Sequence, residues 1–199
     1  MNLVRTLKHK KPVPAIVVGI DASSTAIAFS IFDQQEDQTF LIKTCKINLN
    51  NFPMNNKLQI ISSYIESLFK DLKIDYIFVE QPIYIQNPAT SRVLSQVSGH
   101  ILGECLKHCP NVSEVTIANW KSYIGYKNVS KAEKEKWTKD LGEKESKKMA
   151  ARERKQRTIN IVHNKISGID HVVDNDICDS IGIGLYGLSV VNKGDIDVA

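Results

Sequence analysis

Apolar residues in the first fifty positions fall into three short runs that are separated by brief polar breaks. The runs cover residues 15–20, 26–32 and 39–47. Runs of this length that are rich in β-branched residues are typical of strands, and the connection at 22–25 is small and polar, as in a tight turn. The pattern therefore predicts three consecutive strands that form an antiparallel meander.

The spacing of apolar residues changes to three and four from residue 55 onward, as shown by Leu58, Ile61, Ile65 and Leu68. This spacing places the apolar side chains on one face of a helix. Later runs alternate in the same way between helical and strand character. In chain order we expect a helix at 55–72, a strand at 74–79, a helix at 87–106, a strand at 112–118 and a short helix at 120–125.

The last third of the chain begins with a segment at 127–147 that is rich in Lys and Glu and has Trp137 as its only large aromatic residue. This composition predicts a flexible or weakly helical insertion. Helical spacing returns at 148–165 and at 174–191. The final helix contains small residues, among them Ser180 and Gly184, which allow close packing on a sheet.

The order of these elements predicts an α/β fold. We expect a five-stranded mixed sheet, with strands one to three antiparallel and strands one, four and five parallel, flanked by helices. With 199 residues, of which 42% are hydrophobic, the chain is long enough for one substantial core. We therefore expect a single domain over residues 1–199, with a flexible basic tail at 1–13 and the charged insertion at 127–147.

Composition gives no sign of a membrane or secreted protein. No apolar run approaches the roughly 20 residues needed to cross a bilayer, and the polar start lacks a secretory signal, so we expect a soluble intracellular protein without a membrane partner. The four cysteines have no paired spacing and are expected to be reduced thiols. Cys105, His108 and Cys109 share a helical face, but a zinc site there would need a fourth ligand.

The formal net charge of +4 is modest, but the charge is unevenly distributed. Residues 127–157 contain twelve Lys and Arg against six Asp and Glu. One interpretation is a surface that binds a phosphate backbone, and the other is a solvated helix with ion pairs between neighbouring turns. Charge alone does not decide between them.

Four acidic residues are predicted to meet at one end of the sheet. Asp21 and Glu80 end the first and fourth strands, and parallel neighbours place their carboxyl ends on the same edge. Asp176 and Asp179 are three residues apart, on one face of the last helix. Clustered carboxylates favour hard divalent cations such as Mg²⁺, and a pair of such ions can hydrolyse a phosphodiester. Taken singly, each acid is also explained as a turn or helix cap.

These residues resemble the RuvC-type Holliday junction resolvases of the RNase H-like superfamily, including their phage and viral branches. The resemblance implies that Asp21, Glu80, Asp176 and Asp179 are catalytic and bind two Mg²⁺ ions, for which Mn²⁺ can substitute. It further implies a homodimer that cuts four-way DNA junctions symmetrically. The matching segments, in the family's order, are Val18-Gly19-Ile20-Asp21, Val79-Glu80-Gln81-Pro82 and Asp176-Ile177-Cys178-Asp179.

The same resemblance suggests three DNA-binding residues. Lys121 and Lys155 match lysines of the family, although the long segment at 127–147 allows the position of Lys155 to slip, and an exposed surface lysine is the alternative. Beyond Glu80 the family often has an aromatic residue that stacks on bases. Ile83 takes that place here, and Tyr84, which follows it, is a candidate for stacking or for packing against a dimer partner.

Three other functions share parts of this pattern. A nuclease for flaps or forks would have the same acids, and a non-catalytic DNA-binding protein would keep the basic surface. A sugar-kinase-like phosphotransferase shares the Gly-x-Asp strand end. It would need a glycine-rich phosphate loop after Asp21, where the chain has Ala22-Ser23-Ser24.

Overall fold

The structure is a computed structural model that describes residues 2–4, 12–83, 87–172 and 174–194. Its centre is a mixed sheet with the strand order β1-β4-β3-β2-β5-β6. The bounds of the strands are β1 Asn2–Leu3, β2 Ala15–Ala22, β3 Ala26–Gln34, β4 Thr39–Asn48, β5 Tyr76–Glu80 and β6 Val112–Val115. The helices are α1 Met54–Phe69, α2 Pro88–Leu106, α3 Ile117–Ile124, α4 Lys131–Leu141, α5 Glu143–Lys165 and α6 Asn175–Lys193.

The predicted topology is confirmed with one correction. Strands β2, β3 and β4 form the antiparallel meander, and β5 and β6 continue the sheet in parallel with β2. The sheet has six strands and not five, because Asn2–Leu3 pairs with Phe40 and Leu41 at the edge of β4. These residues belong to the segment that was expected to be a flexible tail. Two residues are too short to show a strand pattern in a sequence.

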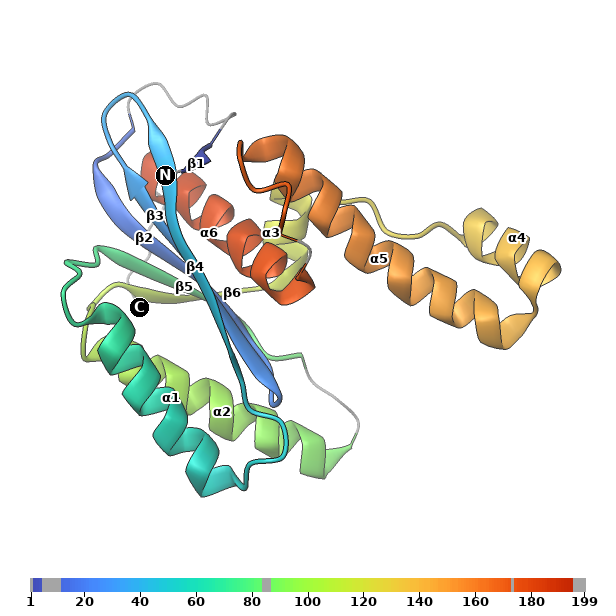
Figure 1. Ribbon diagram of the computed structural model, residues 1–199, viewed down its shortest axis with the longest axis horizontal. Coiled ribbons are helices and arrows are strands. Elements are labelled where there is room, and N and C mark those ends of the chain that lie inside the picture. Colours follow the sequence, from blue (N-terminus) through green and yellow to red (C-terminus); the bar gives the residue numbers. More distant parts are fainter. Residues whose placement is uncertain (1, 5–11, 84–86, 173, 195–199) are drawn as a thin grey trace.

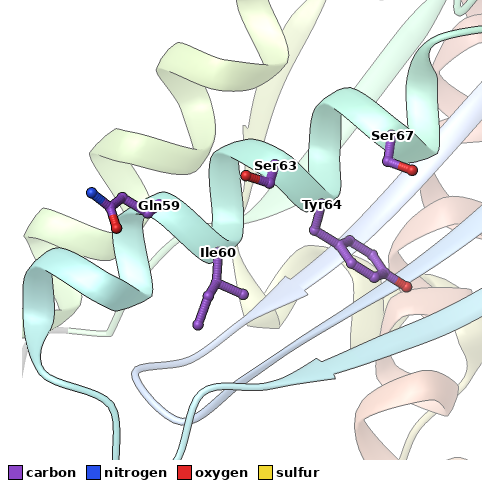
Figure 2. A pocket seen from close by; sticks show the side chains of 5 residues that line it. All are labelled: Gln59, Ile60, Ser63, Tyr64 and Ser67. Atoms are coloured by element: carbon purple, nitrogen blue, oxygen red, sulfur yellow. The ribbon is translucent and has the colours of Figure 1, made fainter.

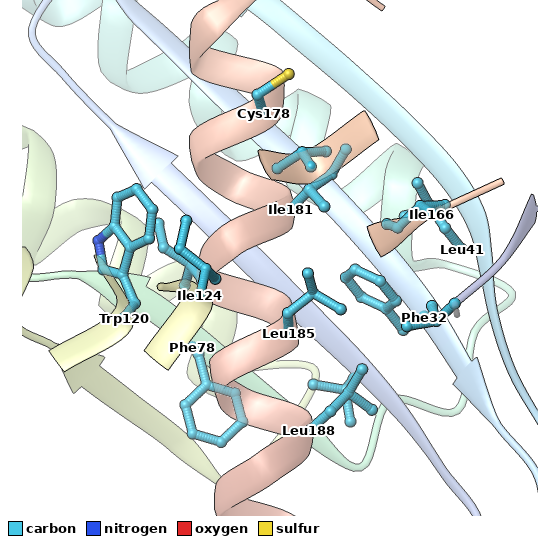
Figure 3. Close-up of a cluster of buried hydrophobic side chains, with 14 of the residues drawn as sticks. Phe32, Leu41, Phe78, Trp120, Ile124, Ile166, Cys178, Ile181, Leu185 and Leu188 are labelled. Atoms are coloured by element: carbon cyan, nitrogen blue, oxygen red, sulfur yellow. The ribbon is translucent and has the colours of Figure 1, made fainter. Parts of the chain in front are cut away.

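Helices cover both faces of the sheet (Figure 1). On one face, α1 and α2 pack against side chains such as Val18 and Ile20 of β2. On the other face, α3, α5 and α6 form a second core with Val17 of β2 and Phe78 of β5 (Figure 3). Alternate residues of a strand point to opposite faces, so β2 is buried on both sides. Gly19 and Asp21 lie two and four residues after Val17, so they point to the same face as Val17, toward the layer of α6.

Helix α6 lies unusually close to the sheet because its small residues leave room for large ones opposite. A Cβ atom on Gly184 would stand 2.3 Å from the Phe32 ring, and one on Gly187 would stand 2.3 Å from the Phe78 ring. A Cβ atom on Gly19 would meet the carbonyl oxygen of Ser180 at 2.4 Å. Strand and helix backbones are thus in direct contact beside Asp21.

The main differences from the sequence prediction concern residues 112–147. The strand expected at 112–118 ends at Val115, because the Thr116 side chain accepts a hydrogen bond from the backbone N–H of Asn119 and caps α3. The segment expected to be flexible or weakly helical contains α4 and the first turn of α5. A capping box of Ser130 and Glu133 starts α4. In Figure 1 this helical hairpin extends away from the sheet and its covering helices.

Candidate active site

Asp21 and Glu80 emerge side by side from parallel strands. In the β2–β5 ladder Ile20 is aligned with Val79, so the next residues on both strands are the two acids. Glu80 lies two residues after Phe78 on the same strand, so it points to the same face as Phe78 and toward the same layer as Asp21. The sequence argument from strand ends is confirmed in this respect.

Close packing of α6 on β2 brings the other two acids to this edge. The buried Ser30 hydroxyl of β3 donates a hydrogen bond to the Ser180 carbonyl at 2.8 Å. Asp179 precedes Ser180 and lies one helical turn after Asp176. The N-terminal turn of α6, which carries both acids, is thereby fixed against the end of the strand that carries Asp21.

The four carboxylates lie in one region, which we call the acidic site, because β2 and β5 end side by side and the first turns of α6 pack on β2 and β3. Burial raises the pKa of Asp21 well above its ordinary value, and the charges of Glu80, Asp179 and Asp176, in that order of size, raise it further. Lys121 partly offsets these effects. Each acid makes the ionised form of its neighbour more costly.

Glu80 is held by a tryptophan. The indole N–H of Trp120, a fully buried residue of α3, donates a hydrogen bond to Oε2 of Glu80 at 2.7 Å. Burial raises the pKa of Glu80 to about 7, and the charge of Asp179 acts in the same direction. The Trp120 hydrogen bond and Lys121 oppose the rise in pKa, because both favour the ionised carboxylate.

Asp179 has one carboxylate oxygen that is bonded and one that is not. The Asn175 side-chain amide donates to Oδ2 at 2.9 Å. Oδ1 is buried and has no hydrogen-bond partner within the described parts of the chain. Burial raises the pKa of Asp179 to about 6, although Lys121 and polar contacts with Asn175 and Thr158 lower it. A buried, unpartnered carboxylate oxygen is costly unless a cation or donor meets it.

Asp176 is turned toward a different partner. Its Oδ2 atom lies 2.6 Å from Nζ of Lys46 on β4, and the same ammonium lies 2.9 Å from Oδ2 of Asp174. Asp174 is the N-cap of α6 and accepts hydrogen bonds from the backbone N–H groups of Asp176 and Ile177. The cap that sequence reasoning considered for Asp176 is therefore made by its neighbour.

The carboxylates are neighbours but do not converge on one point. No group of three or more His, Cys, Asp or Glu side chains in the described ranges is arranged to hold a metal ion. The contacts above explain this: Glu80 is directed to Trp120, Asp176 to Lys46 and one oxygen of Asp179 to Asn175. The shared site of four acids is present, whereas the metal cage expected from the sequence is not formed in this arrangement.

The three predicted DNA-binding residues have different positions. Lys121 of α3 lowers the pKa values of Asp21, Glu80 and Asp179, and its ammonium lies 5.1 Å from the Trp120 ring centre and 5.0 Å from that of Tyr126. Lys155 is exposed on α5. Tyr84 lies outside the described residues.

Sequence reasoning missed the residues that orient the acids. From the sequence, Trp120 is expected only to begin a short helix, and no pattern points to Lys46 or Thr158. The only signal for Trp120 was a large aromatic residue next to Lys121. Nothing in the local pattern indicated Lys46, because it depends on the pairing of β4 with β3 and on the position of α6.

Two other features lie apart from the acidic site. Gln59, Ile60, Ser63, Tyr64 and Ser67 line a hollow along α1 (Figure 2), and none of them belongs to an element that carries the acids. All four cysteines are free, as predicted. His108 contacts Glu66, and no metal site involving Cys105 and Cys109 occurs among the described residues.

A mixed sheet of this order with helices on both faces, and acids where β2, β5 and α6 meet, defines an RNase H-like fold. The family model described as "Crossover junction endodeoxyribonuclease RuvC" matches residues 17–141, which is more than half of the chain, and the protein belongs to this family. The match includes Asp21, Glu80 and Lys121 but ends before α6. The phage or viral branch that the sequence suggested stays a prediction.

Individual relatives agree with this assignment. The crossover junction endodeoxyribonuclease RuvC of Aliarcobacter butzleri (strain RM4018) is 27% identical over 100 residues, which cover 50% of this chain and 65% of that protein. The chain thus spans just under two thirds of this curated relative.

Solved structures show the same fold. The structure of T. thermophilus RuvC in complex with Holliday junction substrate has a TM-score of 0.68 at 11% identity, covering 90% of this chain and 96% of that chain. A Thermus thermophilus RuvC structure has a TM-score of 0.65 at 12% identity with the same coverage. The yeast mitochondrial Holliday junction resolvase Ydc2 has a TM-score of 0.50 at 15% identity, covering 89% of this chain and 82% of that chain.

Across the described ranges, none of the helices has the length and apolar character that crossing a membrane requires.

Proposed function

We propose that this protein is a divalent-metal-dependent endonuclease that resolves four-way DNA junctions. The observation that carries the proposal is that Asp21 and Glu80 leave neighbouring parallel strands where the first turns of α6, with Asp176 and Asp179, pack on the sheet. Membership of the RuvC family and the fold shared with a RuvC bound to junction DNA support it.

The chemistry of the acidic site suits Mg²⁺. Its donors are carboxylate oxygens, which hard cations prefer, and Oδ1 of Asp179 is a buried oxygen that has no partner among the residues that the structure describes. The raised pKa values of Asp21, Glu80 and Asp179 reflect the burial and mutual repulsion that a bound cation would relieve. We assign Asp21, Glu80, Asp176 and Asp179 as ligands, with two Mg²⁺ ions per site and Mn²⁺ as a possible substitute.

Bound Mg²⁺ would supply a water of lowered pKa and charge stabilisation of the departing oxygen. The side chains of the protein have separate tasks. The Trp120 hydrogen bond favours the ionised form of Glu80 against the effect of burial, and Lys121 adds a positive charge beside the acids that suits a phosphate oxygen. Lys46 keeps Asp176 near the end of β4 and must release or share it when a cation binds. Lys155 and Tyr84 remain candidate DNA-binding residues.

The substrate proposal includes a dimer. A four-way junction has approximate two-fold symmetry, so two identical subunits related by a two-fold axis can cut opposing strands at equivalent positions. We therefore propose a homodimer acting on branched DNA. Sedimentation of the protein with and without a junction tests this assembly.

The test of the activity uses an end-labelled four-way junction with Mg²⁺. The native protein is expected to produce paired, symmetric nicks. Asp21→Asn keeps the shape of the side chain but removes its charge, and we expect cleavage to fall by on the order of 10³-fold, since metal-assisted charge stabilisation is worth several kcal/mol. Binding to the junction should persist. Asp37→Asn, on an exposed residue outside the acidic site, is the matched control.

The same assay separates the alternatives. A nuclease for flaps or forks would cut those substrates better than the junction and would place unpaired nicks. A non-catalytic DNA-binding protein would bind the junction without Mg²⁺-dependent cleavage. Cleavage that is the same in Asp21→Asn as in the native protein would falsify the assignment of the acidic site.

A further inference from the structure

The helical hairpin of α4 and α5 carries the positive charge of the chain. We call residues 127–157 the α4–α5 arm. It has twelve Lys and Arg and six Asp and Glu, which gives a formal net charge of +6. The rest of the chain has fourteen Lys and Arg and sixteen Asp and Glu, which gives a net charge of −2. A protein of modest net charge thus has one strongly basic projection (Figure 1).

Most acids of the arm are neutralised within the arm, and most of its bases are not. Five of the six carboxylates form ion pairs there, with Lys131, Lys147, Lys148 and Arg157. The remaining basic side chains of the arm are exposed and have no ion pair within the described residues. They are Lys127, Lys134, Lys136, Lys139, Lys144, Arg152, Arg154 and Lys155.

A row of basic residues on α5 begins beside the acidic site. Thr158 is close enough to lower the pKa of Asp179. Toward the tip of the arm, at steps of four, seven and three residues, the same helix face carries Arg154, Lys147 and Lys144, which we call the arm row. Ile159 of α5 and Cys178 of α6 are buried in the same core and the two helices pack on each other, which places the start of the row near the acids.

The dimensions of the arm row suit a DNA backbone. From Lys144 to Thr158, at 1.5 Å per residue, the helix extends about 21 Å. At roughly 3.4 Å per nucleotide this corresponds to about six phosphates of one strand. A duplex that has its scissile phosphate at the acidic site can therefore run along the arm.

Little of this surface serves to hold the arm together: among the described residues, Lys147 is the one member of the arm row with an ion pair, and its partner Glu143 lies on the same helix. No residue of α4 is buried, and α4 packs on α5 alone among its substantial contacts. Near the tip, the Ser146 hydroxyl donates to the Lys134 carbonyl and receives a hydrogen bond from Thr138, which closes the hairpin. The hairpin is therefore held together from inside while its basic side chains face solvent.

We propose that the arm row binds the phosphate backbone of a duplex arm of branched DNA as it leaves the acidic site. This inference rests on the proposed function, since it assumes that the acidic site acts on DNA. The contacts are to phosphates, so they add affinity and orientation without sequence preference.

The first test measures binding in EDTA, where cleavage is absent. The arm variant Lys144→Gln/Lys147→Gln/Arg154→Gln is compared with the control variant Lys43→Gln/Lys70→Gln/Lys73→Gln, which removes three exposed charges elsewhere. The probe is a four-way junction whose 15-base-pair arms end in hairpin loops. Three lost phosphate contacts should reduce the slope of log K against log salt by about 2.7 in the arm variant. The control should change it little.

The second test shortens the DNA. With junction arms of about four base pairs, the phosphates opposite the outer part of the arm row are absent, so the arm variant and the native protein should bind more nearly alike.

If the arm variant binds long-armed junctions as the control does, the proposal is wrong while the proposed function stands. If its deficit is the same on short arms, the row acts only near the acidic site, and the proposal is again overturned. A native protein that binds neither junction would contradict the proposed function itself.

Discussion

The acidic site and the α4–α5 arm are built in different ways. The acids lie where backbone meets backbone, with Gly19 of β2 against Ser180 and Gly184 of α6. The arm has no buried residue in α4 and is held by a capping box, hydroxyl hydrogen bonds and the ion pairs of Arg157. Metal chemistry needs the backbone positions of the carboxylates to be closely fixed, even where side chains turn on binding, whereas phosphate contacts tolerate movement. The difference in construction matches the difference in proposed task.

The largest expected effect comes from breaking the contact beside the acidic site. In Gly19→Ala the new Cβ atom would stand 2.4 Å from the Ser180 oxygen and 2.5 Å from the Gly184 nitrogen. Neither backbone atom can rotate away, so β2 and α6 must separate. We expect a loss of about 3 kcal/mol in the free energy of unfolding, measured by urea denaturation.

The matched control is Gly103→Ala in α2, where a Cβ atom meets nothing within 4 Å. It should stabilise the helix by about 0.5 to 1 kcal/mol. Equal effects of the two substitutions would show that close packing does not position the acids.

Burial of Glu80 among other acids should lower the stability of the metal-free protein at high pH. The pKa of Glu80 is raised to about 7, so the folded state binds its proton more tightly than the unfolded state does. Its contribution to stability is therefore present in full at low pH and is lost as pH rises through about 7. Without metal, Glu80→Gln should be more stable than the native protein at pH 8 by about 1 kcal/mol, after allowance for solvent contact, and similar at pH 4.

Thermal unfolding in EDTA at several pH values measures this difference. Adding Mg²⁺ should stabilise the native protein more than the variant at pH 8, because a ligand that binds the folded state raises its stability. A variant with the same pH dependence as the native protein would show that Glu80 is not destabilised in its ionised form.

A smaller effect is expected from Trp120→Phe. The Trp120 N–H favours the ionised form of Glu80, so its removal should raise the Glu80 pKa. Because metal binding requires the carboxylate, the rise of the single-turnover cleavage rate with pH should move to higher pH. Trp137→Phe in α4 is the matched control. An unchanged pH profile in Trp120→Phe, at whatever maximal rate, would remove Trp120 from the description of the site.

The sequence predicted the acidic site better than the arm for a physical reason. Asp21 and Glu80 follow from strand ends, and Asp179 from helical spacing, because these patterns depend on local periodicity. The orientation of the side chains does not depend on local periodicity, because Lys46 and Trp120 reach the acids only after the sheet and helices have packed. The direction in which each carboxylate points, on which metal binding depends, is therefore the part of the site that the sequence could not predict.

The same reasoning explains the errors elsewhere. The charged composition of α4 left a flexible segment and a weak helix as equal alternatives, because no apolar stripe marks a helix that buries nothing. The Ser130–Glu133 capping box is the local sequence signal that marks the start of this helix. The edge strand Asn2–Leu3 forms by pairing with β4, and a segment of two residues is too short for its sequence to predict that pairing.

The smallest expected effect tests whether the arm is a separate unit. Arg157 of α5 closes the base of the arm: its guanidinium donates to the Lys127 and Asn128 carbonyls at 3.0 and 3.1 Å and pairs with Glu133 of α4. In Arg157→Gln the amide protons of α4 should exchange several-fold faster while those of α6 do not change, because the arm can open without unfolding the core. Arg152→Gln, which removes an exposed arginine without an ion pair, should leave both rates unchanged. If α6 exchanges faster as well, the arm and the acidic site are energetically coupled, and the contrast in their construction would not extend to their motions.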